Sequence, residues 1–346
     1  MPKTYALLKN PAHTRVSFQD SDTLAIKELS VFANLLHATN IRTAQIGGVT
    51  YILFDCDNEI TPAAVQMLSR MSFVYAIFRY QLDSLVPVTI SPNFYLAPEL
   101  STILKYTGKT NELFTRMMLN LVLLQINNLS ESLNILDPLA GKGTTLYESL
   151  ILGHNAYGVE VDSKPAHESA VYLKKYLETA KLKHTTHTEK ISGVGDGRKF
   201  TSTRHQISVT RTKGESARQY EMLDGDTRYM PTFFRKNFFH AIVADLPYGV
   251  QHGSKAGSKG IKKTQGGSIT RNALGLVKES LPGWVRVLKP GGVIALAWNL
   301  FLISRAEMAE LLMASGFKVV DFGECFAHRV DQAIDRDVIV GVHTLS

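Results

Sequence analysis

An aspartate, a proline and a tyrosine stand together directly after an apolar run. The run is 241–244, and Asp245, Leu246, Pro247 and Tyr248 follow it. The Asp245 carboxylate and the Leu246 carbonyl are two acceptors that can hold both hydrogens of an exocyclic amine. This grip orients the nitrogen lone pair and stabilises developing positive charge without prior removal of a proton. Stacking on Tyr248 adds on the order of 1–3 kcal/mol per base, and Pro247 stiffens the turn. We therefore predict these four residues as catalytic; the plain alternative is a strand that ends in a proline turn.

A glycine-rich turn about a hundred residues earlier predicts a ligand beside that amine. A strand over 133–137 leads into Gly141 and Gly143, which let the backbone come close to a ligand at the carboxyl end of the strand. Asp137 can accept a hydrogen bond from the ammonium of an amino-acid-like ligand, directly or through water. The pattern is not a P-loop, and it is not GxGxxG because Leu146 stands where the third glycine would be. A tight turn with a structural aspartate is the alternative.

Acidic residues follow the next predicted strands. Glu160 lies roughly twenty residues past the glycines, at a strand tip, where an acid holds a ribose diol. Asp162 suits the start of the next helix better. Asp226 follows a further strand and can receive an adenine amino group. We favour Asp226 over Asp196, which lies in a near copy of the segment, because Asp226 leads into the next strand with a normal crossover length.

The composition is that of an ordinary globular protein. The chain has 346 residues, of which 45% are hydrophobic and 20% charged, and this length allows two domains. Apolar runs such as 293–298 are too short to cross a bilayer, and the first residues do not form a signal peptide. Cys56 and Cys325 form no CxxC pair, which excludes a cysteine zinc site and favours a reducing compartment. His184 and His187 lack a third ligand. We therefore expect a cytoplasmic protein with no metal and no membrane partner.

The positive charge is unevenly distributed. The formal net charge is +7, and the excess lies after residue 90, where 31 Lys and Arg face 24 Asp and Glu. Residues 251–272 contain five basic side chains and no acid, which predicts a mobile basic loop. Such a loop would neutralise phosphates, and its contribution to binding would fall with salt. The charge allows a nucleic-acid partner and does not prove one.

Hydrophobic periodicity predicts a small α+β unit over residues 1–90. Gly47 and Gly48 mark a hairpin between two strands, and Thr61 followed by Pro62 begins a helix. The order β-α-β-β-α-β fits a ferredoxin-like sheet with two helices on one face. The expected strands are 3–8, 41–46, 49–54 and 73–80, and the expected helices start near residues 25 and 61. Residues 84–98, which contain three prolines, read as a linker.

The rest of the chain alternates between strands and helices, which predicts a doubly wound sheet whose early strands are parallel. Thr110 is expected to cap the helix that follows it, and Ser304 to open a later helix with a capping box. The polar stretch 184–218 reads as an insertion, for which a hairpin is the candidate structure. A short final connection, 323–336, favours an antiparallel last strand. The candidate strands are 133–137, 156–161, 219–224, 238–244, 292–298, 317–322 and 337–343.

These features resemble class I S-adenosylmethionine-dependent methyltransferases over roughly residues 91–346. The sequence DPLAGKGT at 137–144 looks like their DPxxGxGT cofactor motif, and DLPY at 245–248 looks like the D/N-P-P-Y/F signature of amino methyltransferases. The Leu246 variant, followed by Gly249, is typical of the THUMP-containing tRNA methyltransferases that act on guanosine N2. The sequence NFYLAPE at 93–99 resembles the segment that those enzymes place over the cofactor.

The N-terminal unit looks like the ferredoxin-like domain that precedes THUMP in this family. Between residue 80 and the cofactor motif, however, the chain is too short for a full THUMP module, which docks the tRNA acceptor end in relatives. Lys142 also departs from the family, where small polar residues are usual in the turn. Without that module the resemblance implies RNA binding less strongly, and it allows a different RNA target.

The resemblance implies a Rossmann-like class I methyltransferase domain at 109–346, a linker and cofactor-covering segment at 84–108, and a ferredoxin-like domain at 1–83. It implies methyl transfer from S-adenosylmethionine to an exocyclic amine of an RNA base, most simply guanine N2 in tRNA, with the base extruded into the site. The cofactor-binding residues would be Asp137, Pro138, Ala140, Gly141, Gly143, Thr144, Glu160, Val161, Asp226 and Thr227.

Other functions fit parts of the pattern. The same amine grip serves DNA adenine N6 or cytosine N4, so a DNA methyltransferase is the nearest alternative. A noncatalytic RNA-binding protein that keeps the fold is another. A nicotinamide enzyme is disfavoured by the missing third glycine and by the amine-gripping tetrapeptide.

Overall fold

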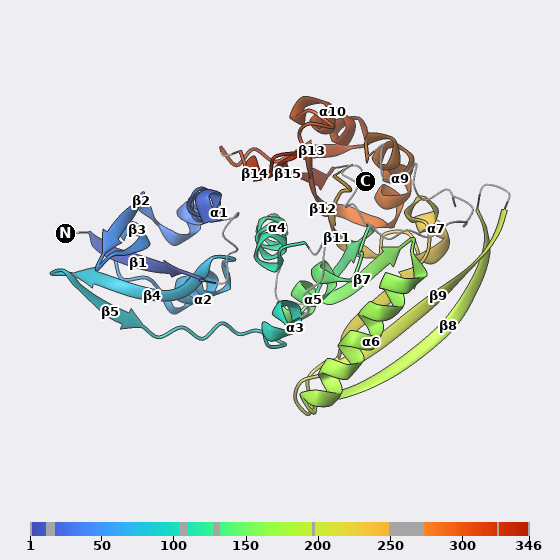
Figure 1. Ribbon diagram of the computed structural model, residues 1–346, viewed down its shortest axis with the longest axis horizontal. Coiled ribbons are helices and arrows are strands. Elements are labelled where there is room, and N and C mark those ends of the chain that lie inside the picture. The colour runs from blue at the N-terminus through green and yellow to red at the C-terminus, as the bar shows by residue number, and fades with distance from the viewer. Residues whose placement is uncertain are drawn as a thin grey trace. The chain divides into compact units, whose positions relative to one another are not determined.

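The computed structural model describes two compact units (Figure 1). One unit comprises 1–93 and 321–336, and the other 94–320 and 337–346. The residues described are 2–11, 18–103, 110–126, 132–195, 198–248, 273–323 and 325–344, with the side chains of 18–21, 194, 195 and 198 set aside. Every helix in these ranges is too short or too polar to cross a bilayer.

The first unit has the β-α-β-β-α-β element order expected for a ferredoxin-like sheet, with one more strand at its edge. Its antiparallel sheet has the order β2-β3-β1-β4-β5. The helix α2 begins where expected, with the Thr61 side chain accepting from the Ala64 N–H and Pro62 in the first turn. The elements are β1 (Lys3–Lys9), α1 (Phe18–Leu36), β2 (Thr39–Ile46), β3 (Val49–Cys56), α2 (Pro62–Arg70), β4 (Val74–Gln81) and β5 (Ser84–Val88).

The strand β5 corrects the expected linker at 84–98. Its residues pair with β4, and Pro87 lies opposite Phe78. Because β5 is an edge strand, the missing proline N–H removes no necessary ladder bond. A second addition to this unit is β14 (His328–Asp331), in the segment 321–336, which pairs as a hairpin with β15 (Ile334–His343).

The second unit is built on a long sheet with the order β13-β15-β12-β11-β6-β7-β10-β9-β8. All seven strands that the sequence predicts for this unit are present. Its strands are β6 (Asn134–Asp137), β7 (Asn155–Glu160), β8 (Lys183–Gly195), β9 (Arg198–Thr210), β10 (Arg218–Asp224), β11 (Phe239–Asp245), β12 (Leu288–Asn299), β13 (Phe317–Val319) and β15. Its helices are α3 (Glu99–Thr102), α4 (Glu112–Leu124), α5 (Thr144–Ile151), α6 (Ser163–Thr179), η1 (Thr227–Tyr229), α7 (Met230–Phe233), α9 (Ala273–Val287) and α10 (Arg305–Ala314).

Five central strands of this sheet form a parallel, Rossmann-like core. β6 pairs in parallel with both β7 and β11, β7 with β10, and β11 with β12. The chain builds outward from β6 through β7 to β10, then returns to the other side of β6 with β11. This reversal is a topological switch point, and ligands of such sheets bind at the carboxyl ends of the strands there. The predicted fold class is confirmed, including antiparallel pairing of the last strand, since β15 runs antiparallel to β13.

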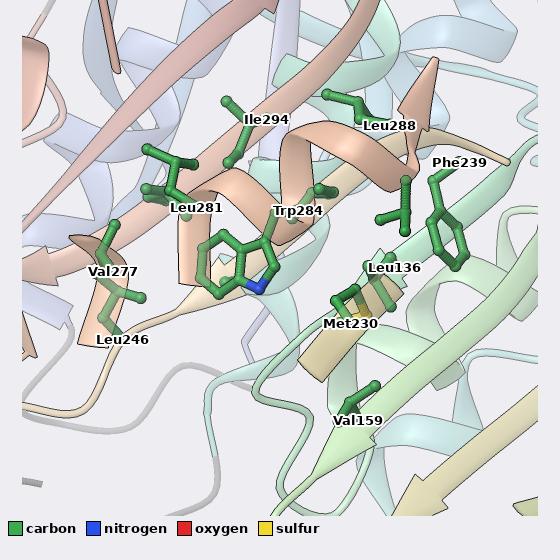
Figure 2. Close-up of a cluster of buried hydrophobic side chains, with 14 of the residues drawn as sticks. Leu136, Val159, Met230, Phe239, Leu246, Val277, Leu281, Trp284, Leu288 and Ile294 are labelled. Atoms are coloured by element: carbon green, nitrogen blue, oxygen red, sulfur yellow. The ribbon is translucent and has the colours of Figure 1, made fainter. Parts of the chain in front are cut away.

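Helices cover both faces of the sheet. One apolar cluster packs α5 and α6 against β7, β9 and β10, while the other packs α7, α9 and α10 against β6, β11 and β12. Trp284 of α9 is fully buried in the second cluster, surrounded by side chains such as Leu281, Met230 and Ile294 (Figure 2). Burial of this kind contributes roughly 25 cal/mol per Å² of apolar surface, and it fixes the strands whose ends carry the site.

Two predicted helix starts have different outcomes. Ser304 opens α10 with the expected capping box, completed by Glu307. Thr110 does not cap α4: the Asn111 side chain accepts from the N–H groups of Leu113 and Phe114 instead. Asn is a better N-cap than Thr, and Asn111, one position after Thr110, has the capping geometry here. The Thr110 hydroxyl is thereby available for another contact.

Candidate active site

The predicted site residues gather at the carboxyl ends of four adjacent parallel strands. Asp137 ends β6, Glu160 ends β7, Asp226 follows β10, and Asp245 ends β11. Asp137 and Asp245 therefore lie on the two strands that flank the switch point. The order of these strands in the sheet, rather than their order in the chain, brings the motifs together.

The glycine turn is shaped by close packing. Gly143 has φ +86, and a Cβ there would lie 2.5 Å from the Ser169 Oγ of α6. Gly158 of β7 lets the turn sit on the strand, because a Cβ would meet Ala140 and Leu146 within 3.0 Å. Gly141 differs: it has φ +51, but a Cβ would meet nothing within 4 Å. Its requirement for glycine is therefore conformational, and its outer side is open to a ligand.

Asp137 is a buried carboxylic acid. Its oxygen accepts from the Leu139 N–H at 3.0 Å, and Thr145 gives a side-chain hydrogen bond. Burial nevertheless raises the pKa of Asp137 to about 7, with smaller contributions from the charges of Asp245 and Glu160. Three carboxylates thus converge on one edge of the sheet, and the buried one is poised between its two protonation states near neutral pH. A cation bound here would shift it to the carboxylate.

Glu160 joins the glycine turn to the next strand. One carboxylate oxygen accepts from the Gly141 N–H and the other from the Asp162 N–H, both at 2.9 Å. Burial raises the pKa of Glu160, and these two N–H groups partly oppose that shift. Each oxygen keeps a second lone pair for a ligand. As predicted, Asp162 caps the helix that follows, with its side chain accepting from Lys164.

A hollow of about 240 Å³ opens beyond the ends of β7 and β10. Val161 lines it and is 65% exposed, unusual for an apolar side chain. Polar and apolar groups both line the hollow, which suits a heteroaromatic ring. The residues around it are Val161, Ser163, Phe200, Thr201, Ser202, Asp224, Gly225, Asp226, Tyr229 and Phe233.

The two predicted residues after β10 lie differently. Asp226 lines the hollow, but its carboxylate forms a forked ion pair with Arg228, with an Nη2–Oδ2 distance of 2.6 Å. It also caps η1 by accepting from the Arg228 N–H. Thr227 is buried, and its hydroxyl accepts from the Trp284 indole at 2.8 Å. The Thr227 side chain therefore serves packing rather than the hollow.

At the end of β11, two hydroxyl groups hold the Asp245 carboxylate. Tyr248 donates to Oδ1, and Thr110, 135 residues earlier in the chain, donates to Oδ2 at 3.1 Å. The turn itself is fixed by the Leu246 N–H, which donates to the carbonyl of Ala297. In this state the Asp245 carboxylate accepts hydrogen bonds from the protein's own side chains, through hydroxyl groups that can reorient.

Leu246 and Pro247 support this turn. The Leu246 side chain is 1% exposed and points into the core beside Val277 (Figure 2). The residue is thereby anchored by its side chain. Pro247 and Tyr248 are partly exposed, and Asn299 donates to the Tyr248 carbonyl at 3.4 Å.

The structure adds partners that the motifs did not reveal. The sequence pattern predicts Thr110 as a helix cap, and only the fold brings its hydroxyl to Asp245. Lys142 forms an ion pair with Glu168 of α6 at 2.7 Å, and this ion pair connects the glycine turn to that helix. Ser169 lies beneath Gly143 and bonds with the Tyr147 hydroxyl. No local signal marks these residues, because each contact joins segments distant in the sequence.

The segment 93–99 is not at this edge, which corrects its expected place over the cofactor. The Tyr95 N–H donates to the carbonyl of Ile151 at the end of α5, and the Tyr95 hydroxyl bonds to Val209. Arg218, at the start of β10, stacks on the same ring at 4.7 Å. These contacts lie at the amino ends of the parallel strands, where the aromatic side chains anchor the chain.

Some predictions lie outside the described residues. They concern Asp196, Gly249, the later part of the covering segment at 104–108 and the basic loop at 251–272. Within the described residues no group of three His, Cys, Asp or Glu side chains is placed to hold a metal ion.

Comparisons with known proteins give fold likenesses of low similarity. No protein-family model and no curated protein sequence matches the chain. Among solved structures, TrmN from Thermus thermophilus is 15% identical with a TM-score of 0.41, over 88% of this chain and 59% of that one. Magnesium protoporphyrin IX methyltransferase from Synechocystis, solved with bound SAM, is 9% identical with a TM-score of 0.40, over 69% and 87%. An rRNA methylase from Streptococcus thermophilus is 9% identical with a TM-score of 0.33, over 62% and 88%. The fold assignment stands on the strand order of the chain itself.

Proposed function

We propose that this protein transfers a methyl group from S-adenosylmethionine to an exocyclic amine of an RNA base, with guanine N2 in tRNA as the substrate. The observation that carries the proposal is the convergence of Asp137, Glu160 and Asp245 at the switch point. Three acids crowded at one edge are unfavourable without a cation, and an amino-acid ammonium beside a sulfonium provides positive charge there.

The chain offers a fitting group for each part of that cofactor. Asp137 would accept from the ammonium, and the turn at Gly141 leaves open space beside it. Glu160 retains lone pairs for a ribose diol. The hollow beside Val161 and Asp226 suits the adenine ring. When bound, S-adenosylmethionine supplies an electrophilic methyl group. Pro138, Ala140, Thr144 and the backbone of Thr227 complete the proposed set as the framework of the turn and of the hollow.

The residues after β11 would hold the base. Asp245 and the Leu246 carbonyl accept the two amine hydrogens, which turns the nitrogen lone pair toward the methyl group. The charge of Asp245 then stabilises the positive charge that develops on nitrogen. Thr110 would keep the carboxylate oriented through Oδ2, and the Tyr248 ring would stack on the base. Pro247 limits the freedom of this turn.

The test is the Asp245→Ala variant, assayed for tritiated methyl incorporation into unmodified tRNA. Loss of a preorganised charge of this kind reduces turnover by about 100-fold or more, while calorimetry should show cofactor binding retained. Glu310→Ala, which removes an exposed carboxylate from α10, is the matched control. Full activity in Asp245→Ala would end the catalytic assignment.

Two further arms of the experiment address the alternatives. Parallel assays on DNA and RNA compare the two classes of base amine, and methylation of DNA alone would replace the RNA proposal. Absence of cofactor binding by the wild-type protein would favour a noncatalytic RNA-binding protein. Mass spectrometry of tRNA nucleosides from a deletion strain, with one methylguanosine lost, would identify the base.

A further inference from the structure

The β8–β9 hairpin is longer than the sheet needs. Both strands have 13 residues, and they pair with each other along their whole length. β9 pairs with β10 only from Val209 to Arg204. The part of β9 from Arg198 to Thr203 continues past the last β10 pair, and six residues of strand span about 20 Å. The hairpin is thus an arm that extends beyond the carboxyl edge of the parallel strands (Figure 1).

The two faces of this arm differ in charge. One face carries acids and their partners: Arg204 pairs with Glu189 at 3.1 Å and with Glu221 at 2.9 Å, and its guanidinium also donates to the carbonyl of Phe233. Phe200 lies on the same face and stacks on Tyr229. This face is therefore used internally, against η1 and α7.

The opposite face has no acid among its described residues. Near the base of the arm it packs on α6, where His205 lies against His167 at 5.3 Å. Farther out it presents exposed lysines and hydroxyl groups at alternate positions of both strands. We define the distal face as Thr188, Lys190, Ser192, Lys199, Thr201 and Thr203, which the cross-strand pairs 188↔205, 190↔203, 192↔201 and 194↔199 place on one side.

The charges around the distal face favour an anionic partner. Lys190 and Lys199 are exposed, and neither forms an ion pair with the described residues. Glu168 of α6 forms an ion pair with Lys142. Asp224 accepts from the backbone N–H of Thr203, so its carboxylate is turned to the strand. Lysines neutralise phosphates, and hydroxyl groups donate to phosphate oxygens and to the 2′-OH of RNA.

The arm is also placed beside the candidate site. Thr201 and Ser202 line the hollow assigned to the adenine ring, so the distal face begins where the cofactor pocket ends. A base held at Asp245 brings its flanking nucleotides to the same carboxyl edge. The distal face lies at this edge, has no acid among its described residues and carries two exposed lysines, so its charge is complementary to those phosphates.

We propose that the distal face of the β8–β9 hairpin docks the sugar–phosphate backbone of the RNA substrate, with Lys190 and Lys199 as its two cationic contacts. This inference rests on the proposed function for the identity of its ligand. In this proposal a β-hairpin of the second unit docks the RNA, a role that a separate RNA-binding module would otherwise have. Contacts of this kind position the RNA and do not read its sequence.

The test compares two double charge reversals on the same hairpin region. Lys190→Glu/Lys199→Glu removes the contacts of the distal face. Lys183→Glu/Lys213→Glu makes the same change in charge at the opposite, amino end, where both lysines are exposed. Dissociation constants for an unmodified tRNA transcript are measured by filter binding at several salt concentrations, and circular dichroism melts check folding.

The distal double variant is expected to bind tRNA at least tenfold more weakly. The slope of log K against log salt should fall by between about 1.4 and 1.8, at 0.7–0.9 per lost phosphate contact. The opposite-end variant should stay within about threefold of wild type. Lys190→Gln/Lys199→Gln should lose a smaller factor, which separates lost attraction from introduced repulsion. Cofactor affinity by calorimetry should be unchanged in all of them.

Equal losses in the two double variants, or no loss in the distal one, would overturn the proposal, as would wild-type protein that does not bind tRNA. The outcomes also separate this inference from the proposed function. If tRNA is methylated but the distal variant binds it normally, the docking role fails and the methyltransferase stands. If the distal variant loses binding but the wild type methylates no RNA, the docking surface stands and the proposed reaction fails.

Discussion

The glycine turn after β6 and the proline turn after β11 end adjacent strands, yet their acids are held in different ways. At the first turn, backbone amides of Leu139, Gly141 and Asp162 donate to the carboxylates of Asp137 and Glu160. At the second, the hydroxyl groups of two side chains hold Asp245. Backbone donors cannot leave without rebuilding the turn, whereas hydroxyl groups rotate at little cost.

The first turn is therefore a preformed site, whereas at the second turn a ligand can replace the hydrogen-bond donors of the carboxylate. The glycine turn, where we propose that the cofactor binds, keeps its shape through close packing at Gly143 and Gly158. Its unfavourable energy is electrostatic, as the raised pKa of the buried Asp137 indicates. Asp245, where we propose that the base binds, already accepts from two hydroxyl groups without a ligand, so an amine bound there would have to replace one of these donors. We therefore expect changes on the cofactor side to alter affinity and stability strongly, and removal of a hydroxyl on the base side to have a small effect.

The largest effect is expected from Asp137→Asn. The change keeps the shape and an acceptor but removes the negative charge, so cofactor affinity should fall by at least about 100-fold, as for a buried charge pair that loses one partner. Calorimetry measures this directly. Affinity within a few-fold of wild type would show that Asp137 does not face the ammonium, and the comparison of the two turns would lose its basis.

The same variant should make the ligand-free protein more stable at pH 8. The folded-state pKa of Asp137 is about 7, above its ordinary unfolded value of about 3.9, so the folded state binds more protons between those pH values. The loss of folding stability that comes from ionising the buried Asp137 is absent below pH 4, grows as pH rises from 4 to 7, and is complete above pH 7. Removal of the charge should recover up to about 4 kcal/mol of the free energy of unfolding, measured by urea unfolding at pH 8 against pH 4.

An intermediate effect is expected from pH alone. Since the cation binds the ionised form of Asp137, cofactor affinity should fall about tenfold for each pH unit below 7, and binding should release close to one proton at pH 6. Calorimetry between pH 5.5 and 7.5, in buffers of different ionisation enthalpy, measures both quantities. The weak binding left in Asp137→Asn should not vary with pH. A wild-type affinity that is flat over this range would contradict the assignment.

The smallest effect is expected from Tyr248→Phe. This change keeps the ring for stacking and removes one of the two hydroxyl groups that donate to the Asp245 carboxylate. Because the exchange of one hydrogen-bond donor for another is nearly balanced in free energy, kcat should remain within about threefold. KM for the RNA should stay level or fall. Steady-state kinetics with unmodified tRNA gives both values. A loss as deep as that of Asp245→Ala would mean that the hydroxyl takes part in the reaction itself, and that the base side is as fixed as the cofactor side.

The four main strands of the first sheet and the parallel strands of the second were predictable because their apolar residues repeat at the strand period, whereas the edge strand β5 and the short strand β14 were not. The glycine turn was predictable because Gly141 and Gly143 follow a buried strand. The hairpin arm was foreseen only in outline, since β8 and β9 are rich in Thr, Lys and His and bury few apolar side chains, such as Ile207 and Val209. The pairing of Arg228 with Asp226, and of Thr110 with Asp245, depends on rotamers and on distant segments, which no local pattern encodes.

The division of the chain into units has a consequence for how this protein can be cut or recombined. Because residues 321–336 belong with the first unit, the chain passes between the units at three points, near residues 93, 320 and 336. Neither unit is a continuous stretch of polypeptide. Removal of the first 93 residues would therefore leave the segment 321–336, which contains the buried Phe326 and Ile334, without the rest of its unit. Any fusion or truncation meant to isolate the second unit has to join residue 320 directly to residue 337.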